Sequence, residues 1–205
     1  MSPSLSTPSC APFPGSQKNK STKVIRDWRG ASASDHFVQF YRTDDYLIEC
    51  LAGYVAEGVW NRDIAVVIAT PEHRIALEER LRAKSVDIFS TMLERQYLAF
   101  DAREMLSKFM FGDRPDRTAF MKVMGDLVRK ATAGGRQLRA FGEMVALLWM
   151  DGKRAAAIEL EQLWNELSRE HAFALFCAYP AVCMDTKGNG PSLEHVCDHH
   201  SCVIS

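Results

Sequence analysis

The stretch from His36 to Arg74 constrains the fold most, because two apolar strand patterns flank one helical pattern in it. Phe37 to Tyr41 is a short β-rich run, and residues 64–69 read Ile-Ala-Val-Val-Ile-Ala. A continuous apolar run of this kind is typical of a strand that a parallel sheet buries on both faces. Apolar residues recur at helical spacing between the two strands. The stretch therefore predicts a right-handed βαβ unit.

The same alternation continues to about residue 180. Further strands are predicted near residues 97–100, 138–141 and 172–179, and helices are predicted over 71–84, over 102–134 with a break at 112–117, and after the turn at 151–152. Residues 86–95 are expected to be an irregular connection. Buried strands that alternate with helices indicate an α/β fold. We expect a three-layer sandwich around a mainly parallel sheet of five strands or more.

Length and composition are those of one globular domain with a tail. The chain has 205 residues, of which 47% are hydrophobic, and a net charge of −1. Residues 1–34 contain eight serines and four prolines and form a predicted disordered, weakly basic leader. The folded domain is expected to span residues 35–205. The balanced charge favours no direct contact with nucleic acid.

No apolar run is long enough to cross a membrane or to form a signal peptide, so a cytoplasmic protein is expected. Six cysteines are too few for a disulfide scaffold in a chain of this length. Most of them should be free thiols in a reducing compartment. Cys50 and Cys177 lie within apolar patterns and are expected to be small core residues.

A binding site is expected where the strands end, because open α/β sheets bind ligands beyond the carboxyl ends of their strands. Polar residues follow each predicted strand, and two apolar residues nearby would form the walls. The predicted ligand-binding residues are Tyr41, Arg42, Glu72, Asp101, Glu143, Met144 and Trp149.

Glu143 carries most of this prediction. It follows Gly142 after an apolar strand and precedes the apolar run Val-Ala-Leu-Leu-Trp-Met. A carboxylate in such surroundings costs free energy unless it is paired. The candidate partners in the sequence are Arg42, Arg103 and Arg139. Asp101, in contrast, is explained almost fully as the N-cap of the next helix, with Glu104 three residues later.

The first strand–helix junction excludes the common nucleotide-binding enzymes. Residues 41–47 contain no glycine, and Asp44 and Asp45 would repel a phosphate group. No serine lies in a Gly-x-Ser-x-Gly turn either. A degenerate hydrolase or transferase that uses Glu72 and Glu143 is the remaining enzymatic option, and it lacks an evident nucleophile. We therefore predict no catalytic residue.

The C-terminus suggests an alternative function. Cysteine and histidine residues are dense there, and they are ligands for zinc and other transition metals, although their spacing matches no common structural zinc site. The predicted metal ligands are Cys197, His199, His200 and Cys202. A metal- or redox-responsive regulator is therefore the second hypothesis, and a terminal strand that contains Val203 and Ile204 is the structural alternative.

Three segments together resemble the MEDS domain, a sensory domain of methanogens and methylotrophs. They are residues 36–74, residues 138–167, which include Gly142-Glu143-Met144, and residues 173–180, followed by His200-Ser201. The resemblance covers about residues 35–205. It implies a fold similar in organisation to ATPase domains of the RecA and KaiC type without their phosphate-binding loop, which agrees with the missing glycines.

The resemblance further implies a sensor without enzymatic activity or a cofactor. Such domains are thought to detect small hydrocarbon derivatives. No DNA-binding, kinase or receiver segment is evident in the sequence. The signal would therefore pass to a partner such as a histidine kinase or a transcription regulator, or through formation of a homodimer.

Overall fold

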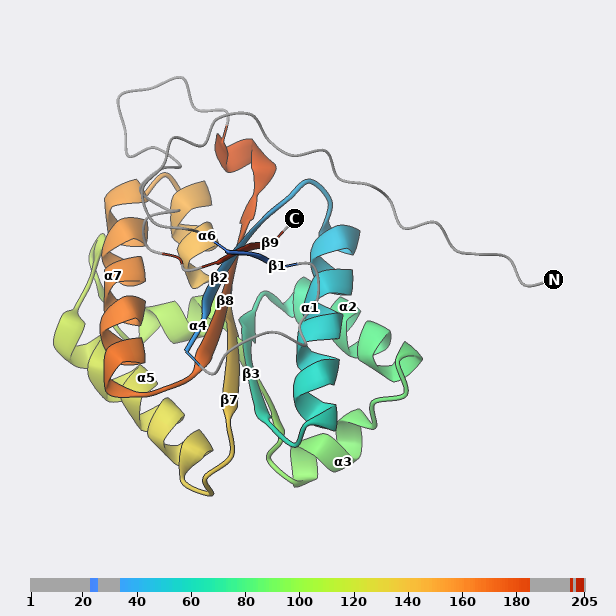
Figure 1. Cartoon of the computed structure of the whole chain (residues 1–205). Helices are drawn as coiled ribbons and strands as arrows, with labels where there is room; N and C mark the ends of the chain where they lie inside the picture. Colours follow the sequence, from blue (N-terminus) through green and yellow to red (C-terminus); the bar gives the residue numbers. More distant parts are fainter. Residues whose placement is uncertain (1–22, 26–33, 185–199, 201, 205) are drawn as a thin grey trace.

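The protein is built around a parallel sheet of seven strands (Figure 1). The computed structural model describes residues 23–25, 34–184, 200 and 202–204. In spatial order the strands are β1 (Lys23–Ile25), β9 (Cys202–Ile204), β2 (His36–Tyr41), β8 (Ala174–Pro180), β7 (Leu138–Gly142), β3 (Ile64–Ala69) and β4 (Tyr97–Asp101). All neighbouring pairs are parallel. The predicted α/β sandwich with a mainly parallel sheet of five or more strands is confirmed.

Helices cover both faces of this sheet, which produces the three layers visible in Figure 1. One side carries α1 (Asp44–Trp60), α2 (Pro71–Ala83) and α3 (Ile88–Leu93). The other carries α4 (Ala102–Ser107), α5 (Arg117–Thr132), α6 (Met144–Met150) and α7 (Arg154–Glu170). Two separate apolar cores result, one on each face. This arrangement explains why β3 is apolar throughout, because all six of its residues are buried between the two helical layers.

The strand alternation of β8 decides which side chains enter which core. Leu175, Cys177 and Tyr179 belong to the core beneath α4–α7, whereas Phe176 belongs to the core beneath α1–α3. Period-two alternation of side chains in a strand causes this division. A polar residue on β8 therefore faces either α7 or α1, and the register fixes which.

Helix starts agree with the sequence signals. The side chain of Thr43 accepts a hydrogen bond from the backbone of Tyr46, and Thr70 caps α2 with Pro71 as its first residue. Asp101 accepts a bond from the Glu104 backbone at the start of α4. These caps satisfy backbone N–H groups that have no partner within the helix. They also place Asp44, Glu72 and Glu104 at the carboxyl edge of the sheet.

Three local features differ from the sequence expectations. The connection at residues 86–95 contains α3, which the side chain of Asp87 caps. The break at 112–117 is largely a hairpin formed by β5 (Met110–Phe111) and β6 (Arg114–Pro115). Within the predicted leader, Lys23–Ile25 form β1, because the C-terminal strand β9 offers them a pairing edge. A 3₁₀ turn over Ala181–Met184 follows β8.

In the part of the chain that the structure describes, no helix has the length and apolar character needed to span a lipid bilayer.

Candidate functional site

Glu143 lies between β7 and α6 and links two adjacent strands at the carboxyl edge. Its backbone N–H donates to the carbonyl of Ile68 at 2.9 Å. Its Oε2 accepts a hydrogen bond from the backbone N–H of Thr70 at 2.7 Å. Glu143 is only 4% exposed. The carboxylate is therefore compensated by a backbone N–H at the start of α2, where the helix dipole also favours negative charge.

His73, in the first turn of α2, is the basic partner of Glu143. Its Nδ1 forms a short hydrogen bond with Glu143 Oε1. Its Nε2 lies 3.6 Å from Oδ1 of Asp44 in the first turn of α1. The hydrogen bond to Glu143 is the main cause that raises the pKa of His73 above its ordinary value. We call Asp44, His73 and Glu143 the edge site.

The edge site runs from the core to the surface. The side chains of Glu143, His73 and Asp44 are 5%, 15% and 74% exposed, respectively. Glu143 follows β7, His73 lies in α2 and Asp44 lies in α1, and the sheet order brings these positions to one edge. The imidazole of His73 is thus held from inside by a buried carboxylate, and an exposed carboxylate faces it from outside at a distance longer than a normal hydrogen bond.

The three arginines that the sequence offered as partners of Glu143 lie elsewhere in the structure. Arg139 donates from Nε to Asp63 at 2.8 Å at the opposite end of the sheet, because strand alternation directs it towards α1. Arg103 pairs with Asp151. Arg42 is exposed in the turn before α1. Sequence analysis left His73 out of the predicted ligand-binding residues, because a histidine beside a helix cap carries no signal about which strand pairs with β3 in the sheet.

The other predicted ligand-binding residues also lie near the carboxyl edge, but they belong to different faces of the sheet. Tyr41 belongs to the core beneath α1–α3, and Met144 and Trp149 belong to the core beneath α4–α7. Asp101 caps α4 and lies 3.8 Å from Arg74, and Glu72 is exposed in the first turn of α2. Their role in ligand binding stays a prediction.

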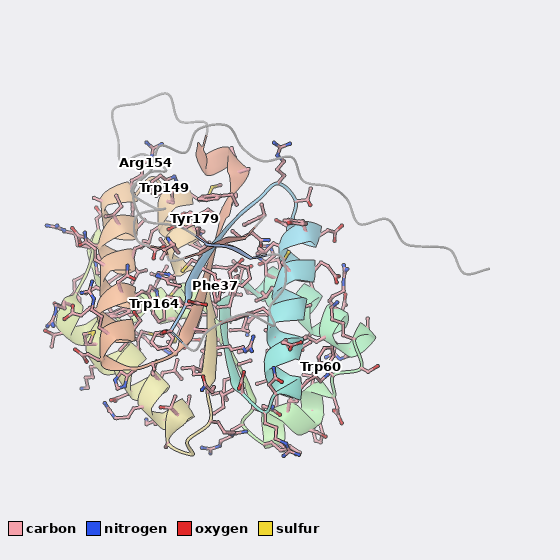
Figure 2. The ribbon with its side chains drawn as sticks, in the orientation of Figure 1. Phe37, Trp60, Trp149, Arg154, Trp164 and Tyr179 are labelled. Carbon is pink, nitrogen blue, oxygen red and sulfur yellow. The ribbon has the colours of Figure 1, made fainter. Side chains whose placement is uncertain are left out.

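Trp149 is part of an aromatic group on the α4–α7 face. Its ring meets Tyr179 edge-on at 6.1 Å, and the guanidinium of Arg154 lies 5.7 Å from its centroid. Figure 2 shows these three side chains together near the carboxyl edge, with Trp164 deeper in the same layer. Trp149 is therefore a packed core residue with a cation over one face.

A second group of polar side chains lies inside the core beneath α4–α7. His36, Glu161, Cys177 and His200 are all buried, and their ligand atoms lie within 4.8 Å of one another. His36 Nε2 is 3.3 Å from Cys177 Sγ and 3.5 Å from Glu161 Oε2. His200 Nε2 is 3.6 Å from Glu161 Oε1. We call these four residues the buried cluster.

Two further residues orient the members of the buried cluster. Nδ1 of His36 is 3.1 Å from the amide oxygen of Asn165, one helical turn after Glu161 on α7. The hydroxyl of Tyr179 donates to Glu161 Oε1 at 2.6 Å. Cys177, His36 and Asn165 form a thiol–imidazole–amide series, which is the arrangement of catalytic residues in some cysteine hydrolases. Burial and the nearby Glu161 raise the pKa of the Cys177 thiol well above its usual value, so the reactive thiolate is disfavoured.

One of the four predicted C-terminal metal ligands belongs to the buried cluster. His200 belongs to the buried cluster, whereas Cys202 begins β9, and Cys197 and His199 lie outside the described residues. Metal binding by the four predicted residues stays a prediction. The sequence signal that was missed is Glu161, a carboxylate on the apolar stripe of α7 between Ala157 and Trp164.

Comparison with known families gives one result. The sequence profile of MEDS, the MEthanogen/methylotroph, DcmR Sensory domain, matches residues 35–201. The match covers nearly all of the predicted folded domain and confirms the resemblance drawn from residues 36–74, 138–167 and 173–180. No curated protein matches the chain.

Proposed function

Since the chain belongs to the MEDS family of sensory domains, we propose that its edge site binds a small organic molecule and that the bound state is read by a partner protein. The molecule would be a hydrocarbon derivative with an oxygen atom that accepts hydrogen bonds. Binding would change the protein's conformational equilibrium and would not be followed by a chemical reaction. The partner would be a histidine kinase or a transcription regulator.

The position of His73 is the observation that carries this proposal. Glu143 holds the imidazole through Nδ1, and this fixes the direction of Nε2, which is a hydrogen-bond donor when the ring is protonated. Nε2 faces Asp44 at 3.6 Å, which is too long for a strong hydrogen bond. A hydroxyl, carbonyl or carboxyl oxygen of a ligand would make a shorter bond to Nε2–H and displace the exposed side chain of Asp44.

The surroundings of the edge site favour binding over catalysis. Asp44 and Asp45 lie in the first turn of α1, where a nucleotide-binding protein would offer backbone N–H groups to a phosphate. Among the described residues, the hydrogen-bond and ion-pair partners of the Glu143 and His73 side chains include no serine or cysteine nucleophile. The carboxylate–imidazole pair alone supplies orientation and charge, which a sensor requires.

A change at the edge site has a direct route to the helices. Asp44 and His73 belong to the first turns of α1 and α2, and these two helices pack against each other. Displacement of Asp44 by a ligand would release one link between their N-termini. A ligand that binds better to one arrangement of α1 and α2 shifts the population towards that arrangement.

The layer of α1–α3 has exposed apolar side chains at the end that lies away from the edge site, and these could contact a protein partner. Trp60, Phe89 and Leu93 are 59%, 72% and 70% exposed at the end of α1 and on α3. Figures 1 and 2 place α3 and Trp60 on the side away from the carboxyl edge. Large apolar side chains exposed together often mark interaction surfaces. The helix α1 connects this region with Asp44.

The test is a binding screen with short-chain alcohols, aldehydes and carboxylic acids, followed by amide chemical shifts in NMR. We expect one class to shift the Thr70 and His73 amides of the wild type and to lose this effect in Glu143→Gln. Glu79→Gln is the matched control, because Glu79 is exposed later in α2. Binding that survives in Glu143→Gln, or shifts confined to other regions, would rule out the edge site.

A further inference from the structure

We propose that His36, Glu161, Cys177 and His200 bind one Zn²⁺ ion in a tetrahedral site within the core. This inference is independent of ligand binding at the edge site, because the two sites share no residue. It also differs from the site predicted at the C-terminus, since only His200 is common to both. Four observations support it.

The first observation is the spacing of the ligand atoms. Zinc lies about 2.0–2.3 Å from its nitrogen, oxygen and sulfur ligands, so the corners of a tetrahedral site are about 3.3–3.8 Å apart. The separations of His36 Nε2 from Cys177 Sγ and Glu161 Oε2 are 3.3 and 3.5 Å. His200 Nε2 lies 3.6 Å from Glu161 Oε1. Since all four ligand atoms lie within 4.8 Å, small side-chain rotations complete the set.

The second observation is the chemistry of the donors. One sulfur, two imidazole nitrogens and one carboxylate oxygen suit a borderline ion such as Zn²⁺, and they do not suit Ca²⁺ or Mg²⁺, which select oxygen ligands. Four protein ligands would close the site to a reacting molecule, as in structural zinc centres. The proposed ion therefore has a structural or regulatory role.

The third observation is that neighbouring side chains hold two of the ligands in place. The amide oxygen of Asn165 can only accept a hydrogen bond, so the proton of His36 lies on Nδ1 and the lone pair of Nε2 points into the cluster. The hydroxyl of Tyr179 donates to Glu161 at 2.6 Å. Metal-binding histidines and carboxylates usually have such partners, which fix their orientation.

The fourth observation is burial of charge. Glu161 and Cys177 are each 1% exposed, and Glu161 lies on the buried face of α7, whose other members are apolar. A buried carboxylate costs several kcal/mol unless positive charge compensates it. A divalent cation in the middle of the buried cluster would neutralise this carboxylate and favour the thiolate form of the neighbouring cysteine at the same time.

The ligands come from four segments that are distant in sequence. His36 begins β2, Cys177 lies in β8, Glu161 lies in α7, and His200 precedes β9. In the register, Cys177 is opposite Val38, so Cys177 and His36 share the sheet face that looks towards α7. A bound ion would thus fasten His200, two residues before β9, to the central sheet. Zinc occupancy would control how firmly the C-terminal strand is held.

The experiment uses the full-length chain, stripped with a chelator and titrated with Zn²⁺ in competition with a chromophoric chelator. We expect one tightly bound Zn²⁺ per chain. Titration with Co²⁺ should give a tetrahedral spectrum with a thiolate charge-transfer band. Cys177→Ser and His36→Gln should lose this band or the tight binding, and the controls Cys50→Ser and His171→Gln should keep both.

Variants of the residues that hold the ligands in place keep the test decisive if a ligand variant fails to fold. Tyr179→Phe and Asn165→Leu should weaken zinc binding by about 10- to 100-fold without loss of the fold, as judged by circular dichroism. A wild type that binds no zinc would overturn the proposal. So would zinc binding that is unchanged in Cys177→Ser and His36→Gln but lost on substitution of Cys197, His199 and Cys202, since the ion would then lie in the C-terminal segment.

Discussion

The edge site and the buried cluster differ in how the fold assembles them. Glu143, His73 and Asp44 lie at the ends of a strand and two helices, and they form a path from the core to solvent. The members of the buried cluster include positions inside β8 and α7, and all are enclosed. The first arrangement suits exchange with a molecule from solution, whereas the second suits an ion that stays bound.

This difference separates two ways in which a sensory domain can use polar residues. A site at strand ends can change without repacking the core, because its residues belong to loops and first turns. A cluster within a core can change only if strands and helices also shift. We therefore expect the edge site to report a ligand and the buried cluster to set the stability of the state that responds.

The largest expected effect on stability comes from a polar contact outside both sites, which serves as a reference for them. Arg139 and Asp63 form a buried ion pair, with side chains 10% and 13% exposed, at the amino end of the sheet. Asp63→Ala leaves a buried guanidinium without its carboxylate and should lower the free energy of unfolding by about 3–5 kcal/mol. Urea denaturation measures this loss. The folded Asp63→Ala variant should bind zinc and ligand as the wild type does. If it lost either, reduced stability alone could explain the loss of binding in the variants of the edge site and the buried cluster.

The next effect concerns the buried cluster. Zinc at about 100 times its dissociation constant should raise the free energy of unfolding of the wild type by about 2.7 kcal/mol, because the ion binds the folded state. Denaturation with and without zinc measures the increase. Cys177→Ser should show little of it, and Glu143→Gln should show all of it. Equal stabilisation of the wild type and Cys177→Ser would contradict the assignment of the ion to this cluster.

A smaller effect is expected when the edge site is changed. Glu143→Gln retains an acceptor for the Thr70 N–H but loses the charged partner of His73. The expected destabilisation is about 1.5–2 kcal/mol, the lower part of the range for hydrogen bonds to charged groups, because the amide of the variant still accepts the Thr70 N–H. Thermal unfolding would measure it, with Glu79→Gln expected within about 0.5 kcal/mol of the wild type. No difference between the two variants would show that Glu143 does not stabilise α2.

The smallest effect is the pH dependence of the same contact. Glu143 raises the pKa of His73 above its ordinary value of 6.5 in the folded protein. The stabilisation is therefore complete below pH 6.5 and is lost as the pH rises through the folded pKa of His73. The stability difference between the wild type and Glu143→Gln should decrease over that interval. NMR titration of His73 checks the cause, since its pKa should fall in the variant.

The sequence predicts the sheet and the edge site better than it predicts the buried cluster, for physical reasons. Apolar runs and caps such as Thr70-Pro71 are local signals, so β3, α2 and the place of Glu143 could be predicted. The partner of Glu143 could not, because the order of strands in the sheet decides that β3 lies beside β7. His73 enters the site only through that adjacency.

The buried cluster depends on register and helix rotation, which no short pattern in the chain specifies. Cys177 has the spacing of a core residue, and it is one, with 1% exposure. Its functional interest comes from His36, 141 positions away, and from the carboxylate of Glu161. Glu161 is the single local sign, since a charged residue on an apolar helical stripe requires a partner in the core.

Native mass spectrometry of the protein purified from its own cells tests the central claim most directly. We predict that the wild type carries one intact small organic molecule, that Glu143→Gln loses it, and that Cys177→Ser keeps it. A molecule that Glu143→Gln retains would contradict ligand binding at the edge site. A chemically altered molecule that appears only with the wild type would contradict a purely sensory role.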